Sequence, residues 1–144
     1  MHVEVNVPIP FSADEVWSLA GGFNLLPILS SGCLGSVLED GGRVRVLTNT
    51  DGSTLWERML SFDERKRTLS YLITDNKNFK SAYDVGYVGT VRIVDDGDGN
   101  SIFNYTGDFE PTPGTSPEQA EQAVQNFAND CAKGIERALK ARSR

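Results

Sequence analysis

Most of the chain alternates apolar and polar residues with a period of two, the spacing typical of half-buried β-strands. The first run, residues 3–9, places Val3, Val5 and Val7 on one face. Six further runs follow, separated by turn-forming stretches rich in Asp, Gly and Asn. These runs span residues 33–38, 43–49, 54–62, 68–74, 82–94 and 101–110. Short connections between consecutive strands predict an antiparallel meander of seven strands.

The segment after the first run changes to a helical period. Ser12, followed three residues later by Glu15, matches a capping box, and Gly21-Gly22 ends the apolar face that follows. Residues 24–32 have room for one or two more helical turns. We therefore expect short helices between the first and second strands.

The C-terminal residues predict one long amphipathic helix. Ser116 and Gln119 form a second capping box, with Pro117 at the first helical position. The apolar stripe that follows consists of Ala120, Val124, Phe127, Cys131, Ile135 and Leu139. A sheet of this size curls and needs one face covered, and only this helix is large enough to cover it. We expect one α+β domain over residues 1–144, a curved seven-stranded antiparallel sheet wrapped around the C-terminal helix.

Composition and charge limit the kinds of protein that this chain can be. Charged residues make up 24% and hydrophobic residues 39% of the chain, and the net charge is -6. The sequence lacks the roughly 20-residue apolar run that a membrane-spanning helix needs, and its start does not resemble a secretory signal. We therefore expect a cytoplasmic protein without membrane insertion. Basic residues cluster only in the short stretches ERKR and KARSR, which we interpret as a turn and a solvated helix end, so a nucleic-acid partner is not expected.

Several kinds of catalytic or metal site lack the residues they need. His2 is the single histidine, so a Ser–His–Asp triad or a His/Cys zinc site is not expected. Cys33 and Cys131 lie far apart and outside any CxxC motif, so we expect free thiols. The stretch DDGDGN resembles a calcium loop, but Ser101 and Gly107 occupy its sixth and twelfth positions. We interpret it as a hairpin turn and expect no metal and no cofactor.

The order of elements and several motifs resemble the START-like, helix-grip superfamily that includes the birch pollen allergen. Within it, the chain is most similar to the bacterial polyketide cyclase/dehydrase and lipid-transport family. The matching stretches are ADEVWSLAGGFNLLP, ERMLSFDERKRTLSYLI, YVGTVRI and YTGDFEP. The resemblance implies a helix-grip fold with a cavity under the helix that binds a small hydrophobic molecule. Some members are enzymes, and the fold alone does not separate the two roles.

The stretch ERMLSFDERKRTLSY also resembles the plant abscisic-acid receptors. Their gate sequence is replaced here by residues 48–52, TNTDG, and their latch has no counterpart in TDNKNFKSA. Their pocket lysine falls near Pro27-Ile28, where this chain has no lysine. We therefore do not expect hormone sensing by that mechanism.

Alternation assigns residues to the inner face of the sheet. On the strand 43–49 it places Val44, Val46 and Thr48 inside and Arg45 outside, and on the strand 82–94 it places Val85 inside. The predicted ligand-binding residues are Glu57, Met59, Tyr71, Tyr87, Gly89, Phe103, Tyr105, Phe109, Phe127 and Cys131. Such a mainly apolar set with a few polar groups is typical of small-molecule sites. Gly89 and Gly107 bend the sheet, make room for a ligand, or do both.

Glu57 is the one carboxylate that alternation places inside the sheet, because Leu55 and Met59 flank it two residues either side. Three roles remain open: a solvated or paired structural group, a polar anchor for a ligand, or the general acid/base of an enzyme. The leading expectation is a monomer or homodimer that binds a small polyketide, lipid or aromatic metabolite. The alternative is a cofactor-independent polyketide cyclase or dehydratase with Glu57 as its catalytic residue. A regulator that binds another protein without a ligand is a third, weaker alternative.

Overall fold

The computed structural model describes residues 1–143 and contains one seven-stranded antiparallel sheet with the strand order β1-β7-β6-β5-β4-β3-β2. The strands are β1 (His2–Ile9), β2 (Cys33–Glu39), β3 (Val44–Asn49), β4 (Thr54–Asp63), β5 (Thr68–Lys77), β6 (Val88–Asp95) and β7 (Ser101–Asp108). The helices are α1 (Ala13–Ala20), α2 (Leu26–Leu29) and α3 (Pro117–Arg142), and a single 3₁₀ turn, η1 (Asp40–Gly42), joins β2 to β3. The predicted meander holds for β2–β7, whereas β1 pairs with β7 instead of with β2, because the short helices carry the chain across to the other edge of the sheet. The short helices after β1 and the long C-terminal helix are confirmed.

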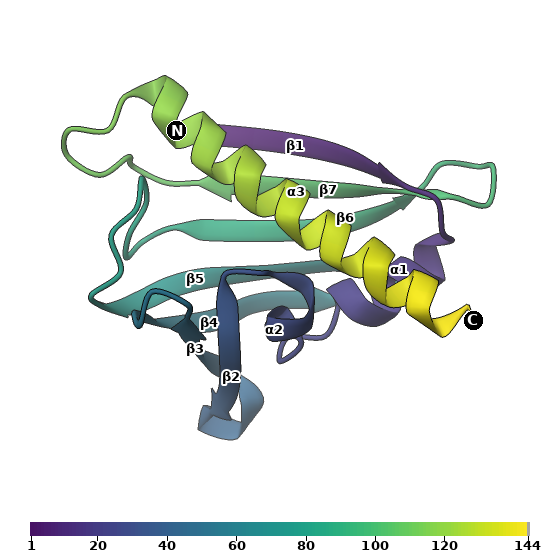
Figure 1. Cartoon of the computed structure of the whole chain (residues 1–144), viewed down its shortest axis with the longest axis horizontal. Helices are drawn as coiled ribbons and strands as arrows, with labels where there is room; N and C mark the ends of the chain where they lie inside the picture. Colours follow the sequence, from purple (N-terminus) through teal and green to yellow (C-terminus); the bar gives the residue numbers. More distant parts are fainter. Residues whose placement is uncertain (144) are drawn as a thin grey trace.

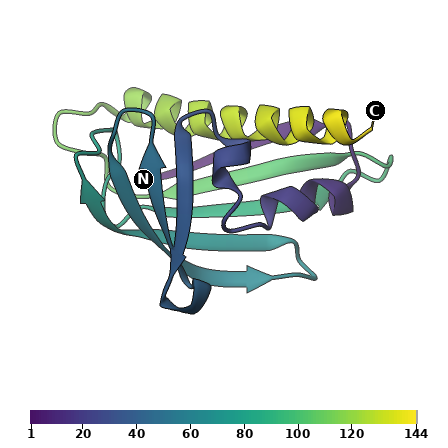
Figure 2. The ribbon, with the colours of Figure 1, turned by 60° about the horizontal axis from the view of Figure 1, so that its bottom comes forward.

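The sheet curves around α3, which runs diagonally across its concave face (Figure 1). Seen from the side, α3 forms one layer and the strongly twisted sheet the other, while α1 and α2 fill the gap between them at one end (Figure 2). Val124, Ala128 and Ile135 on the inner stripe of α3 are fully buried against the sheet. The apolar stripe read from the sequence is therefore the face that holds the helix on the sheet.

Both helix starts follow the capping chemistry that the sequence predicts. The Ser12 hydroxyl accepts from the backbone N–H of Glu15, and the Ser116 hydroxyl accepts from that of Gln119. In both cases the residue at the third helical position bonds back to the backbone of the capping serine. These contacts satisfy N–H groups that have no partner within the helix.

Gly134 allows α2 and α3 to pack at backbone distance. A Cβ atom at this position would lie 1.9 Å from the carbonyl oxygen of Leu29. No side chain fits there, so the glycine fixes how closely α2 approaches the long helix. This contact holds α2 over one end of the sheet, next to the site described below.

Two sequence-based assignments of faces are wrong. On β3, Val44 is buried as predicted, but Arg45 and Leu47 are buried too, whereas Val46 is half-buried and Thr48 is exposed. From residue 45 onward the inner positions are therefore shifted by one residue from the prediction. Residues 82–87 do not form a strand: Gly86 has a φ of +98° and turns the chain before β6 begins. Val85, expected inside, is consequently 55% exposed.

Candidate functional site

A pocket of about 470 Å³ opens between the sheet, α2 and α3. Its inner walls are formed by Leu47, Leu55, Glu57, Tyr71 and Tyr87 from the sheet side and by Phe127 from α3. Its mouth is formed by exposed residues of two connections and of α3, namely Ser31, Gly32, Thr50, Asp51 and Asn126. The curvature of the sheet creates this space, because α3 covers the sheet without filling its hollow.

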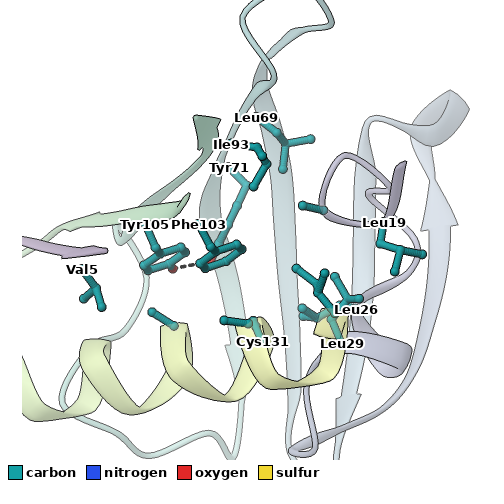
Figure 3. Close-up of a cluster of buried hydrophobic side chains, with 14 of the residues drawn as sticks. Val5, Leu19, Leu26, Leu29, Leu69, Tyr71, Ile93, Phe103, Tyr105 and Cys131 are labelled. Carbon is teal, nitrogen blue, oxygen red and sulfur yellow. Dashed lines mark hydrogen bonds between the residues drawn. The ribbon is translucent and has the colours of Figure 1, made fainter. Parts of the chain in front are cut away.

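A smaller cavity of about 30 Å³ adjoins the pocket on the side of α1. Leu26, Tyr71 and Phe127 line both spaces and form the partition between them. Arg45 and Cys131 line only the smaller one. Figure 3 shows this end of the core, with Leu26 and Leu29 facing Cys131 and the aromatic rings of the sheet.

Arg45 and Glu57 form a buried ion pair at the inner end of the pocket. They are directly opposite each other on β3 and β4, and each is 4% exposed. Glu57 Oε1 accepts from Arg45 Nε at 2.9 Å and lies 2.7 Å from Nη2. Nη1 donates to the carbonyl oxygen of Phe23 at 2.9 Å, and the rings of Phe23 and Tyr71 lie 4.5 and 4.7 Å from the guanidinium carbon. Such pairing is what makes two buried charges tolerable in a core.

The second carboxylate oxygen of Glu57 is free. Oε2 accepts no hydrogen bond within residues 1–143, yet this part of the chain contains no unpartnered side-chain oxygen that is sealed from solvent. Oε2 must therefore have accessible surface, and Glu57 lines the larger pocket. The ion pair thus fixes one oxygen of the carboxylate and presents the other to whatever occupies the pocket.

Three tyrosine hydroxyls, from β5, from β7 and from Tyr87 just before β6, form a hydrogen-bonded chain. Tyr105 Oη lies 2.6 Å from Tyr71 Oη and 2.7 Å from Tyr87 Oη. Figure 3 shows the first of these bonds as a dashed line. Three hydroxyl protons serve two hydrogen bonds, so one proton remains for a further acceptor. Tyr71 and Tyr87 line the larger pocket, so one of these hydroxyls can donate a hydrogen bond to a bound molecule.

The two inward glycines make room for the tyrosine chain. A Cβ atom on Gly89 would lie 2.4 Å from Cζ of Tyr71 and 2.7 Å from Oη of Tyr105. A Cβ atom on Gly107 would lie 2.7 Å from Oη of Tyr87. The space that these residues leave is therefore taken by phenol groups rather than by the pocket.

Burial keeps the tyrosine hydroxyls protonated. Desolvation by burial is the largest cause of the raised pKa of both Tyr71 and Tyr105. For Tyr71, the negative charge of Glu57 acts in the same direction and the positive charge of Arg45 acts against it. The pKa values of Tyr83 and Tyr87 are raised for the same main reason. The chain therefore offers neutral hydroxyl groups, which donate and accept hydrogen bonds, over the whole physiological pH range.

Two carboxylates stand at the mouth of the pocket and are held by serines. Asp130 on α3 accepts from Ser30 Oγ at 3.1 Å and from the backbone N–H and hydroxyl of Ser31 at 2.9 and 2.7 Å. Asp51 accepts from the backbone N–H and hydroxyl of Ser53, which lowers the pKa of Asp51. These hydrogen bonds brace the α2–β2 turn against α3 and stabilise the β3–β4 turn.

The loop of residues 78–87 supplies two aromatic side chains that close one side of the pocket. Phe79 and Tyr83 line it, with their ring centres 5.7 Å apart, and Tyr83 stacks on Tyr87 at 4.4 Å. Asn76 holds the loop by bonding both the N–H and the carbonyl of Phe79. Thr112 holds its other side through the backbone of residues 81 and 82. These anchors give the aromatic wall a defined position.

The structure distributes the predicted site residues over three environments. Glu57, Tyr71, Tyr87 and Phe127 line the larger pocket, and Tyr71, Phe103, Tyr105, Phe127 and Cys131 line the smaller cavity. Gly89 lies beneath the tyrosine hydroxyls, and Phe109 packs on Tyr87 with ring centres 5.2 Å apart. Met59 is a half-buried residue at the margin of the core. Of the described residues, Met59, Gly89 and Phe109 are thus the predicted ones that line neither space.

Sequence reasoning missed Arg45, Phe79, Tyr83 and Asp130. Alternation predicts an outward Arg45, and the other three residues lie on a loop or on the flank of α3, where alternation gives no direction. A signal for Arg45 was available, since a hairpin pairing Thr48 with Thr54 also pairs residue 45 with Glu57. An arginine opposite the one inward carboxylate was therefore predictable from the turn.

Residues 1–143 contain neither a metal-binding cluster nor a membrane-spanning helix. No group of three His, Cys, Asp or Glu side chains in this range is placed to hold a metal ion. No helix in it is long and apolar enough to cross a membrane. Cys33 and Cys131 are buried and free, as predicted, and burial raises the pKa of both thiols.

Comparison with known proteins identifies relatives along the whole chain. The sequence profile of the family described as polyketide cyclase / dehydrase and lipid transport matches residues 1–143. No curated protein sequence matches significantly. Among solved structures, the protein XoxI from Bacillus cereus is 30% identical, with 99% of this chain and 98% of that one aligned at a TM-score of 0.87.

Two more distant structures share the fold. Ara h 8.0201 is 19% identical over 98% of both chains, with a TM-score of 0.78. A START superfamily protein from Mycobacterium smegmatis is 15% identical over 97% of both chains, with a TM-score of 0.75. The helix-grip architecture and the START-like resemblance predicted from the sequence are confirmed.

Proposed function

The chain belongs to the polyketide cyclase/dehydrase and lipid-transport family, and from that premise we propose that it binds a small, largely apolar molecule in the pocket under α3. Glu57 and the tyrosine hydroxyls orient the polar end of this molecule. Leu47, Leu55 and Phe127 surround its apolar part.

The pocket of about 470 Å³ is the observation that carries the proposal. Its volume falls within the range of small-molecule sites, and its apolar walls with a few convergent polar groups match their usual chemistry. A core built for stability alone would fill this space, since protein interiors pack nearly as densely as organic crystals. The unbonded Oε2 of Glu57 adds a polar group that a ligand can satisfy.

Titration with 1-aminoanthracene, an uncharged apolar fluorophore, tests the proposal. Asn126→Trp places a large side chain at the mouth of the pocket, whereas Asn129→Trp places one on the exposed surface of the same helix, outside the pocket lining. We expect the fluorophore to bind the wild type and Asn129→Trp equally and to bind Asn126→Trp at least about tenfold more weakly. Equal binding by both variants, or none by the wild type, would contradict the proposal.

The free oxygen of Glu57 also favours a second candidate, a cofactor-independent cyclase or dehydratase. An ionised carboxylate in a pocket can remove a proton from a carbon acid, and a tyrosine hydroxyl can donate to the resulting enolate oxygen. Exchange of the central protons of 2,4-pentanedione with deuterated water, followed by NMR, tests this chemistry. A wild-type acceleration that Glu57→Gln abolishes supports it, while identical rates with both proteins rule out Glu57 as the base.

A further inference from the structure

The charges around the pocket point to the chemical class of the ligand. Three carboxylates line the larger pocket, from Asp51 and Asp130 at the mouth and Glu57 at the inner end. Its remaining polar side chains are neutral, and among the described residues no Lys, Arg or His lines it. An anionic ligand would therefore meet only like charges as it enters.

The buried cation nearby is already committed to other partners. Arg45 lines the smaller cavity, and each of its three side-chain nitrogens has a partner in Glu57 or the carbonyl of Phe23. Rings of Phe23 and Tyr71 cover its faces. A ligand carboxylate could reach this guanidinium only by displacing Glu57, which would leave that residue buried without its counter-charge.

The free acceptor in the pocket defines what the polar end of a ligand must supply. Oε2 of Glu57, on a side chain that is 4% exposed, needs a hydrogen-bond donor. Hydroxyl and ammonium groups are such donors, and bonds to a charged acceptor are stronger than neutral ones. The spare proton of the tyrosine chain can in turn donate to a ligand oxygen.

From these contacts we infer that the pocket selects small apolar molecules whose polar end is a hydroxyl or an amine, and discriminates against carboxylates. The inference rests on the proposed function and adds the charge class of the ligand to it. Fatty-acid anions and other carboxylates should therefore bind more weakly, because Asp51 and Asp130 repel them at the mouth and Glu57 already occupies Arg45.

Displacement of bound 1-aminoanthracene by 1-decanol, decylamine and decanoate at pH 7 tests the inference, because the three competitors share one apolar chain and differ in the charge of the end group. For the wild type we expect decanol and decylamine to displace the fluorophore at concentrations at least about tenfold lower than decanoate. Equal potency of decanoate would overturn the inference and leave the proposed function standing. Failure of the fluorophore to bind the wild type would remove both.

Two variants test whether Glu57 and Arg45 cause the preference for decylamine over decanoate. Glu57→Gln leaves Arg45 without a negative partner, so decanoate should bind at least about tenfold more tightly than to the wild type and the preference for decylamine should fall. The double variant Arg45→Met, Glu57→Leu removes both charges and preserves an apolar core, so it should fold and lose most of the difference between decylamine and decanoate. An unchanged preference in the folded double variant would contradict the role assigned to Glu57.

Discussion

Arg45 and Glu57 occupy opposite positions on β3 and β4, and Nη2 of the arginine lies 2.7 Å from Oε1 of the glutamate inside the core. The pair joins three parts of the molecule. Arg45 also bonds the carbonyl of Phe23 after α1 and packs on Tyr71 of β5, while Glu57 reaches the pocket. A break in this pair therefore affects both the stability of the fold and the polarity of the site.

Removal of one partner should be more harmful than removal of both. Arg45→Met leaves the carboxylate of Glu57 buried and unpaired, and we expect it to lower the free energy of unfolding by about 3–5 kcal/mol. The double variant Arg45→Met, Glu57→Leu should recover most of this loss, because no unpaired charge remains. Urea unfolding followed by circular dichroism measures both. If the loss in the double variant equals the sum of the losses in Arg45→Met and Glu57→Leu alone, the two side chains are not coupled.

Substitution of Gly89 should disturb the tyrosine chain. The methyl group of Gly89→Ala would overlap Cζ of Tyr71, and we expect a loss of about 1–3 kcal/mol in the free energy of unfolding. Gly35→Ala on β2 is the matched control, because a Cβ atom there has no neighbour within 4 Å, and it should change stability by less than about 0.5 kcal/mol. Equal effects of the two substitutions would contradict the close packing described for Gly89.

Removal of the Tyr105 hydroxyl, at the centre of the tyrosine chain, should lower the free energy of unfolding more than removal of the unpaired Tyr83 hydroxyl. Tyr105→Phe removes both bonds of the chain and leaves the hydroxyls of Tyr71 and Tyr87 without this partner, so we expect a loss of about 1–3 kcal/mol. The hydroxyl of Tyr83 has no hydrogen bond within residues 1–143, and Tyr83→Phe should change stability by less than about 0.5 kcal/mol. Thermal unfolding of both variants compares them directly, and a larger loss in Tyr83→Phe would contradict the assigned chain.

The protein should unfold in alkali together with the ionisation of its tyrosines. All four tyrosines have pKa values raised above the ordinary 10.0, mainly because burial disfavours the charged form. A pKa that is higher in the folded than in the unfolded state stabilises the fold below pH 10 and loses this effect as the pH rises beyond it. We expect tyrosinate absorbance at 295 nm to appear in one cooperative step with unfolding. Gradual ionisation of a protein that remains folded would contradict the burial of the hydroxyls.

Most of the fold was predictable from the sequence because its signals are local. Alternation in residues 54–62 and 101–110, the two capping boxes and the stripe on α3 each depend on neighbours a few residues apart. The inward position of Glu57 followed from Leu55 on the same strand, since side chains two residues apart share a face.

The parts that failed depend on contacts between strands or on loop conformation. Alternation predicts Arg45 on the outer face, where a charged residue is normally solvated, and only its pairing with Glu57 makes its burial tolerable. The sequence predicts Val85 on the inner face because residues 82–94 alternate like one continuous strand. In the structure, the left-handed backbone of Gly86 turns the chain, and the strand begins only after it. Phe79 and Tyr83 lie on this connection, where no periodicity assigns a direction.

The central claim is that an apolar molecule binds between the sheet and α3 rather than on the surface. Methyl NMR with intermolecular NOEs to 1-aminoanthracene tests it most directly. Leu47 and Leu55 line the pocket, whereas Leu34 and Leu38 are exposed leucines on the edge strand β2 and serve as internal controls. We predict NOEs from the fluorophore to the methyl groups of Leu47 and Leu55, with none to those of Leu34 and Leu38. NOEs confined to Leu34 and Leu38 would place the fluorophore on the outer edge of the sheet and contradict the account.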